Sequence, residues 1–229
     1  MSDTAVHKIR NIAVVGHSGS GKTSLIEAML CIAGAIPQKG SIEKGTTVCD
    51  FDPLEKQFGH SLQTALVNME SHGARLYLSD TPGLPDFAGQ SVAALAAADT
   101  ALVVVDAQLG VQMMTERMMR LAAARNLCRM IVVNRIDAPG VDFAALLERL
   151  RAAFGKECLP INLPTAGGER VIDCFFTPDY DAVPAFSSVR EAHDQIVDQV
   201  VEVDEDLMAL YLEQGESLQP EQLHDPFEQ

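Results

Sequence analysis

The sequence predicts an α/β fold, a mostly parallel sheet with helices on both faces. Apolar runs rich in β-branched residues recur near residues 11, 75, 100 and 129. Their apolarity is continuous rather than alternating, as expected for strands that are covered on both faces. Helical patterns separate the runs, as the crossovers between parallel strands require. These patterns span residues 24–33, 92–98, 115–124 and 143–154.

One segment, TALVNMESHGARLYLSD at residues 64–80, departs from this alternation. Only a His-Gly turn separates its two apolar runs, which is too short for a crossover helix. The two runs should therefore pair as an antiparallel hairpin. We expect this hairpin at one edge of the sheet.

The pattern changes after Gly155. LPINLPTAGGERVIDCFF, residues 159–176, predicts short strands around a Gly-Gly turn. Apolar residues then recur every three or four positions, which predicts one or two amphipathic helices. They are Ile196, Val200, Val203, Leu207 and Leu210. We expect a core at 1–156 and a small α+β inserted subdomain at 157–229, which ends in an incomplete return to the core.

The chain is acidic, with 17 Lys and Arg against 32 Asp and Glu among 229 residues and a formal net charge of −15. A long-range field that attracts the whole chain to nucleic acid is therefore excluded. The segment 191–229 contains no Lys or Arg. Its acidic residues predict either a solvated helix face or a docking surface for a basic partner.

The cysteines favour a reducing compartment. Five are present, an odd number, and none forms a Cys-x-x-Cys pair, so buried thiols are expected rather than disulfides or a zinc site. The first ten residues lack the apolar core of a signal peptide, and the most apolar window, 93–107, is interrupted by Asp99 and Asp106. We expect a soluble, cytoplasmic protein without a membrane partner.

The segment AVVGHSGSGKTSL, residues 13–25, carries the spacing G-x-x-x-x-G-K-[ST] of a phosphate loop. Its glycines let backbone N–H groups turn toward phosphates, Lys22 neutralises the outer phosphate oxygens, and the Thr23 hydroxyl reaches magnesium. The helix that follows adds the positive end of its dipole. This motif between a strand and a helix predicts a P-loop NTPase.

Two further motifs follow strands. In DTPG, Asp80 could hold magnesium through water and the Gly83 N–H could contact a γ-phosphate. In VVNRID, the Asp137 carboxylate can accept two hydrogen bonds from guanine that adenine cannot donate, while Asn134 ties this loop to the phosphate loop. Each motif alone is also an ordinary turn. Together, at the ends of parallel strands, they predict a site at the carboxyl edge of the sheet.

At these residues the chain resembles the GTP-binding domain of translational GTPases, and elongation factor G most closely. The resemblance covers nearly the whole chain. It rests on GHSGSGKTS (16–24), DFDPLEKQFGHSLQTA (50–65), DTPGLPDF (80–87), TALVVVDAQLGVQMMTER (100–117), VVNRID (132–137) and GVDFAALLERLRAAFG (140–155).

The resemblance implies GTP or GDP with Mg²⁺ as ligands, and residues 50–65 as the first switch region. Thr23, Ser61 and Asp80 would serve the metal, with Ser61 in the place of the family's threonine, and Lys22 would offset transition-state charge. The implied nucleotide-binding residues are Gly16, His17, Ser18, Gly19, Ser20, Gly21, Lys22, Thr23, Ser24, Asp80, Gly83, Asn134, Arg135 and Asp137.

Several residues depart from the family pattern. Leu84 stands where the family has the histidine that positions the hydrolytic water, and leucine cannot orient water. Gly19 replaces an aspartate, Arg135 replaces a lysine that covers the guanine face, and FGHS at 58–61 replaces RGIT. The family's last guanine-contacting loop, a Ser-Ala pair beyond the insert, lies past the end of this sequence. The chain therefore resembles a divergent, paralogous branch, truncated before that loop.

Three functions remain open. The first is the GTP-binding domain of an elongation factor G-like GTPase that acts with the ribosome, its hydrolysis ribosome-stimulated and impaired. The second is a nucleotide-dependent binding switch that hydrolyses slowly or not at all. The third is a P-loop ATPase or kinase, which NRID argues against. Because the family's insert contacts the ribosomal stalk protein, the resemblance also implies that residues 191–216 form that surface, and that the remaining domains of a full-length factor are partners.

Histidines and methionines are interpreted as structural. His17 should support packing of the phosphate loop, and His60 and His72 should lie in exposed loops, since neither has a second metal ligand at a useful spacing. Four methionines, Met113, Met114, Met118 and Met119, share one predicted helix. They are expected to pack in the core, with an adaptable partner groove as the alternative.

Overall fold

The computed structural model describes residues 6–202 of the chain. It divides into two compact units, Met1–Arg135 and Ile136–Gln229. The division falls at residue 135, about twenty residues before the boundary expected from the change in composition.

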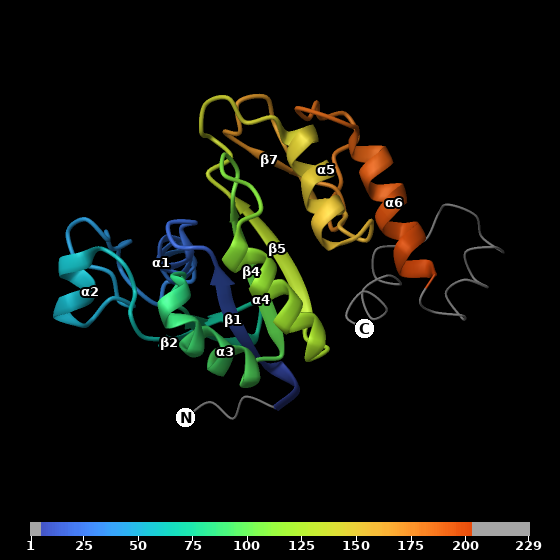
Figure 1. Ribbon diagram of the computed structural model, residues 1–229. Coiled ribbons are helices and arrows are strands. Elements are labelled where there is room, and N and C mark those ends of the chain that lie inside the picture. Colours follow the sequence, from blue (N-terminus) through green and yellow to red (C-terminus); the bar gives the residue numbers. More distant parts are fainter. Residues whose placement is uncertain (1–5, 203–229) are drawn as a thin grey trace. The chain divides into compact units, whose positions relative to one another are not determined.

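The first unit contains a five-stranded sheet with the order β2-β3-β1-β4-β5 (Figure 1). Strands β1, β3, β4 and β5 are parallel, and β2 pairs antiparallel with β3. The predicted hairpin and its place at the edge are therefore confirmed. The strands are β1 (Ile9–Gly16), β2 (Ala65–Ser71), β3 (Ala74–Asp80), β4 (Thr100–Asp106) and β5 (Cys128–Asn134).

Helices cover both faces of this sheet, as predicted. The α1 residues Ile26 and Leu30 pack in one cluster with Val14, Leu78 and Leu102, which all lie on one face. The intervening residues of β1 and β4 are also buried, and Figure 1 shows α3 and α4 on that opposite face. The helices are η1 (Val6–Lys8), α1 (Lys22–Ile32), α2 (Pro53–Phe58), η2 (Pro85–Phe87), α3 (Ala88–Ala96) and α4 (Met113–Ala124).

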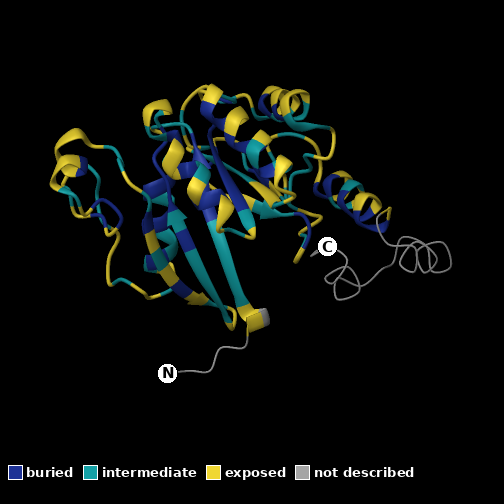
Figure 2. Cartoon of the chain, turned by 60° about the horizontal axis from the view of Figure 1, so that its bottom comes forward, coloured by how far each residue is buried: buried dark blue, intermediate teal, exposed yellow. Residues whose placement is uncertain are grey.

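Burial explains why the two central strands, β1 and β4, read as continuous apolar runs. Ala13, Val14 and Val15 of β1 are all fully buried, as are Val103 and Val104 of β4. Figure 2 shows buried residues in the middle of the sheet, whereas other stretches of the strands are intermediate in burial. Central strands of a parallel sheet have no solvent face, so successive residues are both apolar.

The second unit is a small α+β assembly with its own cores. A short antiparallel pair of strands lies around the Gly-Gly turn, as predicted. Phe175 packs with Ile196 and Val200, and Leu163 packs with Cys174 and Val189. The elements are α5 (Phe143–Phe154), β6 (Asn162–Pro164), β7 (Val171–Asp173) and α6 (Val189–Val201).

Helix α6 begins at Val189, before Ile196, where the predicted amphipathic pattern starts. Val189, Ala192, Ile196 and Val200 are buried, while Asp194 and Asp198 lie on the polar side. Ser188 caps this helix by accepting a hydrogen bond from the Glu191 N–H at 3.1 Å. The remainder of the predicted acidic surface, residues 203–216, lies outside the described residues.

Helix α2 was not predicted, although the sequence carries a signal for it. Asp52 accepts a hydrogen bond from the Leu54 N–H, and Glu55 accepts one from the Asp52 N–H, with Pro53 in the first turn. This capping box, Asp-Pro-x-Glu, is a recognised helix start. It was missed because six residues are too few for apolar periodicity.

The cysteine prediction is partly wrong. Cys49 and Cys174 are buried free thiols, but Cys128 at the start of β5 is exposed, and Cys31 and Cys158 are half-buried.

Of the methionines, Met114, Met118 and Met119 are buried as predicted, whereas Met113 is 61% exposed. Within residues 6–202, no helix is both long and apolar enough to cross a membrane.

Candidate nucleotide-binding site

The phosphate loop connects β1 directly to α1 at the carboxyl edge of the sheet. Gly16, Gly19 and Gly21 have φ values of 142°, 79° and 91°, which side-chain-bearing residues rarely adopt. A Cβ atom on Gly16 would also clash with the Val104 carbonyl of β4. These glycines therefore allow the tight turn that leaves the first N–H groups of α1 free for a ligand.

Lys22 is buried at the start of α1. Its ammonium donates a hydrogen bond to the His17 carbonyl oxygen at 2.8 Å, across the phosphate loop. Burial lowers the pKa of Lys22 to about 8, and the nearby Asp80 carboxylate raises it in part. Asp80 offsets the cost of burying the Lys22 ammonium only in part, so this cation is suited to bind an anionic ligand.

Three side-chain oxygens converge beside Lys22. The Thr23 hydroxyl donates to Asp80 Oδ2 at 2.7 Å and lies 3.5 Å from the Ser61 hydroxyl. Burial raises the pKa of Asp80 to about 6, against the lowering effects of Thr23 and Lys22. The three residues predicted to serve magnesium, Thr23, Ser61 and Asp80, are thus brought together from α1, the 40–64 segment and β3.

Buried carboxylates hold the 40–64 segment in place. Asp50 accepts hydrogen bonds from the Ser61 hydroxyl at 2.9 Å and from the Thr47 hydroxyl at 2.9 Å. Glu27 of α1 accepts from the N–H groups of Gly40 at 2.8 Å and Val48 at 2.6 Å. The segment therefore depends on side chains for bonds that a helix or strand would supply from its backbone.

A third carboxylate, Glu55, joins α2 to the end of this segment. Its side chain accepts hydrogen bonds from the Leu62 N–H at 2.8 Å and the Gln63 N–H at 3.1 Å. Glu55 is 1% exposed. These bonds fix the chain on the C-terminal side of Ser61, as Asp50 fixes the serine itself.

The DTPG turn lies against the phosphate loop. The Ser18 N–H donates to the Gly83 carbonyl oxygen at 3.0 Å, and the Thr81 hydroxyl donates to the Val14 carbonyl oxygen at 2.7 Å. A Cβ atom at Gly83 would clash with Ser18 and the Lys22 ammonium. Leu84 follows at the N-terminal cap of η2, half-buried and without a polar side-chain group.

Asn134 ties the end of β5 to the phosphate loop, as the sequence predicted. Its side-chain amide donates to the Ser20 carbonyl oxygen at 2.9 Å. Next to it, the Arg135 guanidinium donates to Asp106 Oδ2 at 2.8 Å. Asp106 is buried, and it also accepts from the Gln108 and Leu109 N–H groups. This pairing fixes the guanidinium at the loop where a base would lie.

Asp137 is an exposed residue of the turn after β5 and belongs to the second compact unit. Its guanine-reading role stays a prediction. Sequence reasoning missed four positioning residues, Glu27, Asp50, Glu55 and Asp106. The sequence carries a signal for two of them: Asp106 ends a strand at the same sheet edge as Asp80 and Asn134, and Glu55 completes the capping box of α2.

The donor set of this site fits a magnesium-bound nucleotide. Three buried polar atoms of the predicted site residues, His17 Nδ1, Ser20 Oγ and Asp80 Oδ1, have no hydrogen-bond partner within the described residues. Hydroxyl and carboxylate oxygens are the ligands that Mg²⁺ prefers. Lys22 and the N-terminus of α1 would face the phosphates, and the metal and phosphate charges would compensate the buried Asp80 and Lys22.

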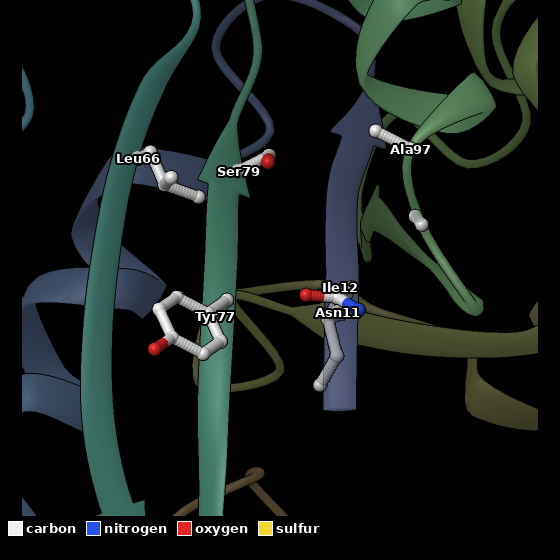
Figure 3. Close-up of a pocket in the computed structure, with 7 residues that line it drawn as sticks. Asn11, Ile12, Leu66, Tyr77, Ser79 and Ala97 are labelled. Atoms are coloured by element: carbon white, nitrogen blue, oxygen red, sulfur yellow. The ribbon is translucent and has the colours of Figure 1, made fainter. Parts of the chain in front are cut away.

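A separate hollow lies on the sheet face, away from these residues. Its volume is about 280 Å³, and Tyr77 and Ser79 of β3 line it with Leu66 of β2 (Figure 3). Asn11 and Ile12 of β1 complete it beside the end of α3. None of the predicted site residues lines this hollow, and it offers no cationic side chain for phosphate.

The chain is similar to several known proteins. The family model described as the elongation factor Tu GTP binding domain matches residues 7–218. An elongation factor G-like protein of Mycobacterium tuberculosis is 35% identical over 217 residues, which cover 89% of this chain and 30% of that protein. A mitochondrial ribosome-releasing factor 2 of Candida dubliniensis is 31% identical over 157 residues, covering 69% of this chain and 20% of the relative.

A solved structure from Thermus thermophilus has the same fold. It is 39% identical, with a TM-score of 0.84 over 96% of this chain and 35% of that one. The chain thus spans about a third or less of the proteins to which it is compared. Because the family match covers most of its length, the chain belongs to the elongation factor Tu GTP-binding domain family, the GTP-binding domains of translational GTPases.

Proposed function

We propose that this chain is the GTP-binding domain of an elongation factor G-like protein that acts with the ribosome and binds GTP or GDP with Mg²⁺. The observation that carries the proposal is the convergence of Thr23, Ser61 and Asp80 beside Lys22, at the mouth of the phosphate loop. Residues 16–24 would hold the phosphates.

The remaining roles follow from the chemistry of each group. Thr23 and Ser61 would bind the metal directly and Asp80 through water, while Mg²⁺ would neutralise the phosphate oxygens. The Gly83 N–H would contact the γ-phosphate, whose contacts can order a switch segment before any cleavage. Lys22 would offset the negative charge that develops on the β–γ bridging oxygen.

Base selectivity would come from the loop after β5. Asn134 fixes this loop to Ser20, Arg135 would stack on the base, and Asp137 would accept hydrogen bonds from the guanine N1–H and amino group. This pattern disfavours adenine, so an ATPase or kinase is the least supported of the three functions.

A magnesium-dependent titration with fluorescent GTP and ATP tests the proposal. We expect selective GTP binding that Lys22→Ala abolishes, because the substitution removes the buried cation. Lys39→Ala, at an exposed lysine, is the matched control and should bind like the wild type. Equal affinity for ATP would contradict the guanine assignment, and no binding at high micromolar nucleotide would contradict the site in this chain.

Asp137→Ala tests the base reader alone. A hydrogen bond to a charged group is worth about 1.5–3 kcal/mol, so the substitution should weaken GTP binding by about 10- to 100-fold. Affinity for ATP should stay unchanged, since adenine gains nothing from this carboxylate. The same titration measures both nucleotides, and an unaltered GTP affinity would remove Asp137 from the site.

A second candidate function is a binding switch that hydrolyses GTP slowly or not at all. Leu84 favours it, because a leucine at the start of η2 offers no group to orient water. Leu84→His is the discriminating substitution. If the histidine restores ribosome-stimulated turnover, the native chain has lost only its water-positioning group, and if it does not, Leu84 is not what limits hydrolysis.

We also propose an acidic docking surface on the second unit. Asp194, Asp198 and Glu202 of α6 and its C-terminal cap lie within residues 191–216, the segment suggested for the ribosomal stalk protein. Binding through these carboxylates should weaken steeply with salt. Absence of binding to the stalk protein at low ionic strength would exclude this surface.

A further inference from the structure

The site as described lacks a group to position the hydrolytic water. Near the three converging oxygens, Asp50 is occupied by Ser61 and Thr47, and Asp80 accepts from Thr23. The Glu55 carboxylate is occupied by backbone N–H groups. Leu84 has no polar atom in its side chain. Any water-orienting side chain must therefore come from another position.

His60 lies beside this site. It directly precedes Ser61, whose hydroxyl is 3.5 Å from that of Thr23. Its ring is not in an exposed loop, as the sequence suggested, but half-buried between two aromatic rings. It stacks on Phe58 at a centroid distance of 5.9 Å and packs against Phe87 at 6.3 Å.

The contact with Phe87 joins the imidazole to the short helix that begins after Leu84. Phe87 ends η2, the 3-10 turn whose N-terminal cap is Leu84. His60 therefore connects the 40–64 segment to the turn that follows DTPG. Two aromatic contacts therefore restrict the motion of the ring.

The hydrogen bonding of the ring favours one tautomer. His60 Nδ1 lies 3.4 Å from the Ser61 carbonyl oxygen. A carbonyl oxygen only accepts, so Nδ1 carries the proton of this bond. Nε2 is then the ring nitrogen left to accept a hydrogen bond, and no hydrogen bond joins it to another group within residues 6–202.

We propose that His60 orients the attacking water in GTP hydrolysis, the task that Leu84 cannot perform. This inference rests on the proposed GTP-binding function. His60 Nε2 would accept a hydrogen bond from the water, whose oxygen forms the new bond to the γ-phosphorus. The bond from phosphorus to the β–γ bridging oxygen breaks, its electron pair stays on GDP, and the water's proton ends on the released phosphate.

The His17 ring is the competing candidate. It lies in the phosphate loop, and its Nδ1 is buried without a hydrogen-bond partner in the described residues. However, its backbone carbonyl is held by Lys22, and no ring contact connects it to the turn after DTPG. The structure therefore favours His60, and the experiment includes both residues.

The test uses the whole chain under single-turnover conditions, with labelled GTP and ribosomes present or absent. His60→Phe keeps the aromatic packing and removes the nitrogen, so it should lower the cleavage rate by about 100-fold or more. Its affinity for fluorescent GTP should change less than about twofold. His60→Gln, which retains an acceptor, should recover part of the rate. His72→Asn, at an exposed histidine of the β2–β3 turn, is the matched control.

A second measurement does not depend on turnover. Aluminium fluoride with GDP mimics the γ-phosphoryl group in its transition state, so the affinity for this pair reports water orientation through binding alone. Wild type should bind GDP more tightly when aluminium fluoride is present, and His60→Phe should lose that gain while keeping its affinity for GDP. His72→Asn should keep both.

The outcomes separate this inference from the proposed function. A chain that does not bind GTP contradicts the proposed function. A chain that binds GTP, but in which His60→Phe leaves both the cleavage rate and the aluminium fluoride effect unchanged, contradicts the role of His60. That role is also contradicted if only His17→Gln lowers them, or if wild type shows neither cleavage nor an aluminium fluoride effect.

Discussion

At the scale of single residues, the site contains two ionisable groups at buried positions, where burial disfavours their charged forms. Lys22 and Asp80 are 6% and 1% exposed, and burial shifts both pKa values toward neutrality. Neither group is stabilising for the fold by itself. A ligand that supplies the opposite charges explains their arrangement. Without nucleotide, the cost of burying Lys22 and Asp80 should lower the free energy of unfolding.

The Lys22 ammonium should make stability depend on pH. Its pKa falls from 10.5 in the unfolded chain to about 8 in the fold, so between these values the unfolded state binds more protons. The free energy of unfolding should therefore rise from pH 8 to pH 10, by about 2–3 kcal/mol relative to Lys22→Met. Below pH 8 the penalty is fully present and the difference should be constant.

Urea unfolding of nucleotide-free protein at several pH values measures this effect. The comparison with Lys22→Met removes contributions from other groups that titrate at high pH. Lys39→Met, at an exposed lysine, should follow the wild type throughout. A difference between wild type and Lys22→Met that does not change with pH would show that Lys22 keeps an ordinary pKa.

At the scale of elements, buried carboxylates connect a helix to a segment with little secondary structure. Glu27 extends from α1 to the N–H groups of Gly40 and Val48, and it is fully buried. Gly40 leaves the room for this contact, because a Cβ atom there would lie 2.8 Å from the Glu27 carboxylate. The position of Ser61 thus depends on α1 as well as on its own neighbours.

Glu27→Gln should loosen this connection. A glutamine of the same size places an amide donor against one of the two N–H groups, so a buried hydrogen bond is lost and a donor left unpaired. We expect a loss of about 1–3 kcal/mol in the free energy of unfolding. Hydrogen exchange at Gly40 and Val48 should accelerate. Exchange in β4 should accelerate only as far as the lower free energy of global unfolding accounts for.

The matched control for this prediction is Glu148→Gln in α5. Its side chain is 72% exposed and pairs with Arg151 at 3.3 Å, a surface ion pair of small value. Its unfolding free energy should stay within about 0.5 kcal/mol of the wild type. If Glu27→Gln behaves in the same way, the Glu27 contacts contribute nothing to holding the segment.

At the scale of the whole molecule, the chain has separate cores in its two units. The first is built on the sheet around Val14, Ile26 and Leu78, and the second around α6 and the β6–β7 pair. Separate cores allow each unit to open without the other. Chemistry in the first unit should then tolerate changes in the core of the second.

Ile196→Ala tests this independence. Truncating a buried isoleucine costs about 2–4 kcal/mol, and Ile196 is 3% exposed in the core of the second unit. Hydrogen exchange should accelerate in α6, whereas β1 and β4 should keep their protection. Val183→Ala, at a residue that is 82% exposed, is the control and should change neither. Equal loss of protection in both units would mean that they unfold together.

Much of this protein is determined by the sequence itself. Continuous apolar runs predict buried parallel strands, the His-Gly turn predicts the edge hairpin, and the glycine spacing with Lys22 and Thr23 predicts the phosphate loop. These features depend on backbone conformation and on neighbours within a few residues, so a local pattern is sufficient to predict them.

Tertiary structure alone decided which side chains hold the site together. Glu27, Asp50 and Asp106 act through partners that packing brings to them, Glu27 across 13 and 21 positions and Asp106 across 29. His60 was read as an exposed loop residue because the sequence gives no sign of the Phe87 ring against it. Burial and contact are properties of the folded chain. The same carboxylate side chain is solvated at one position and buried and hydrogen-bonded at another.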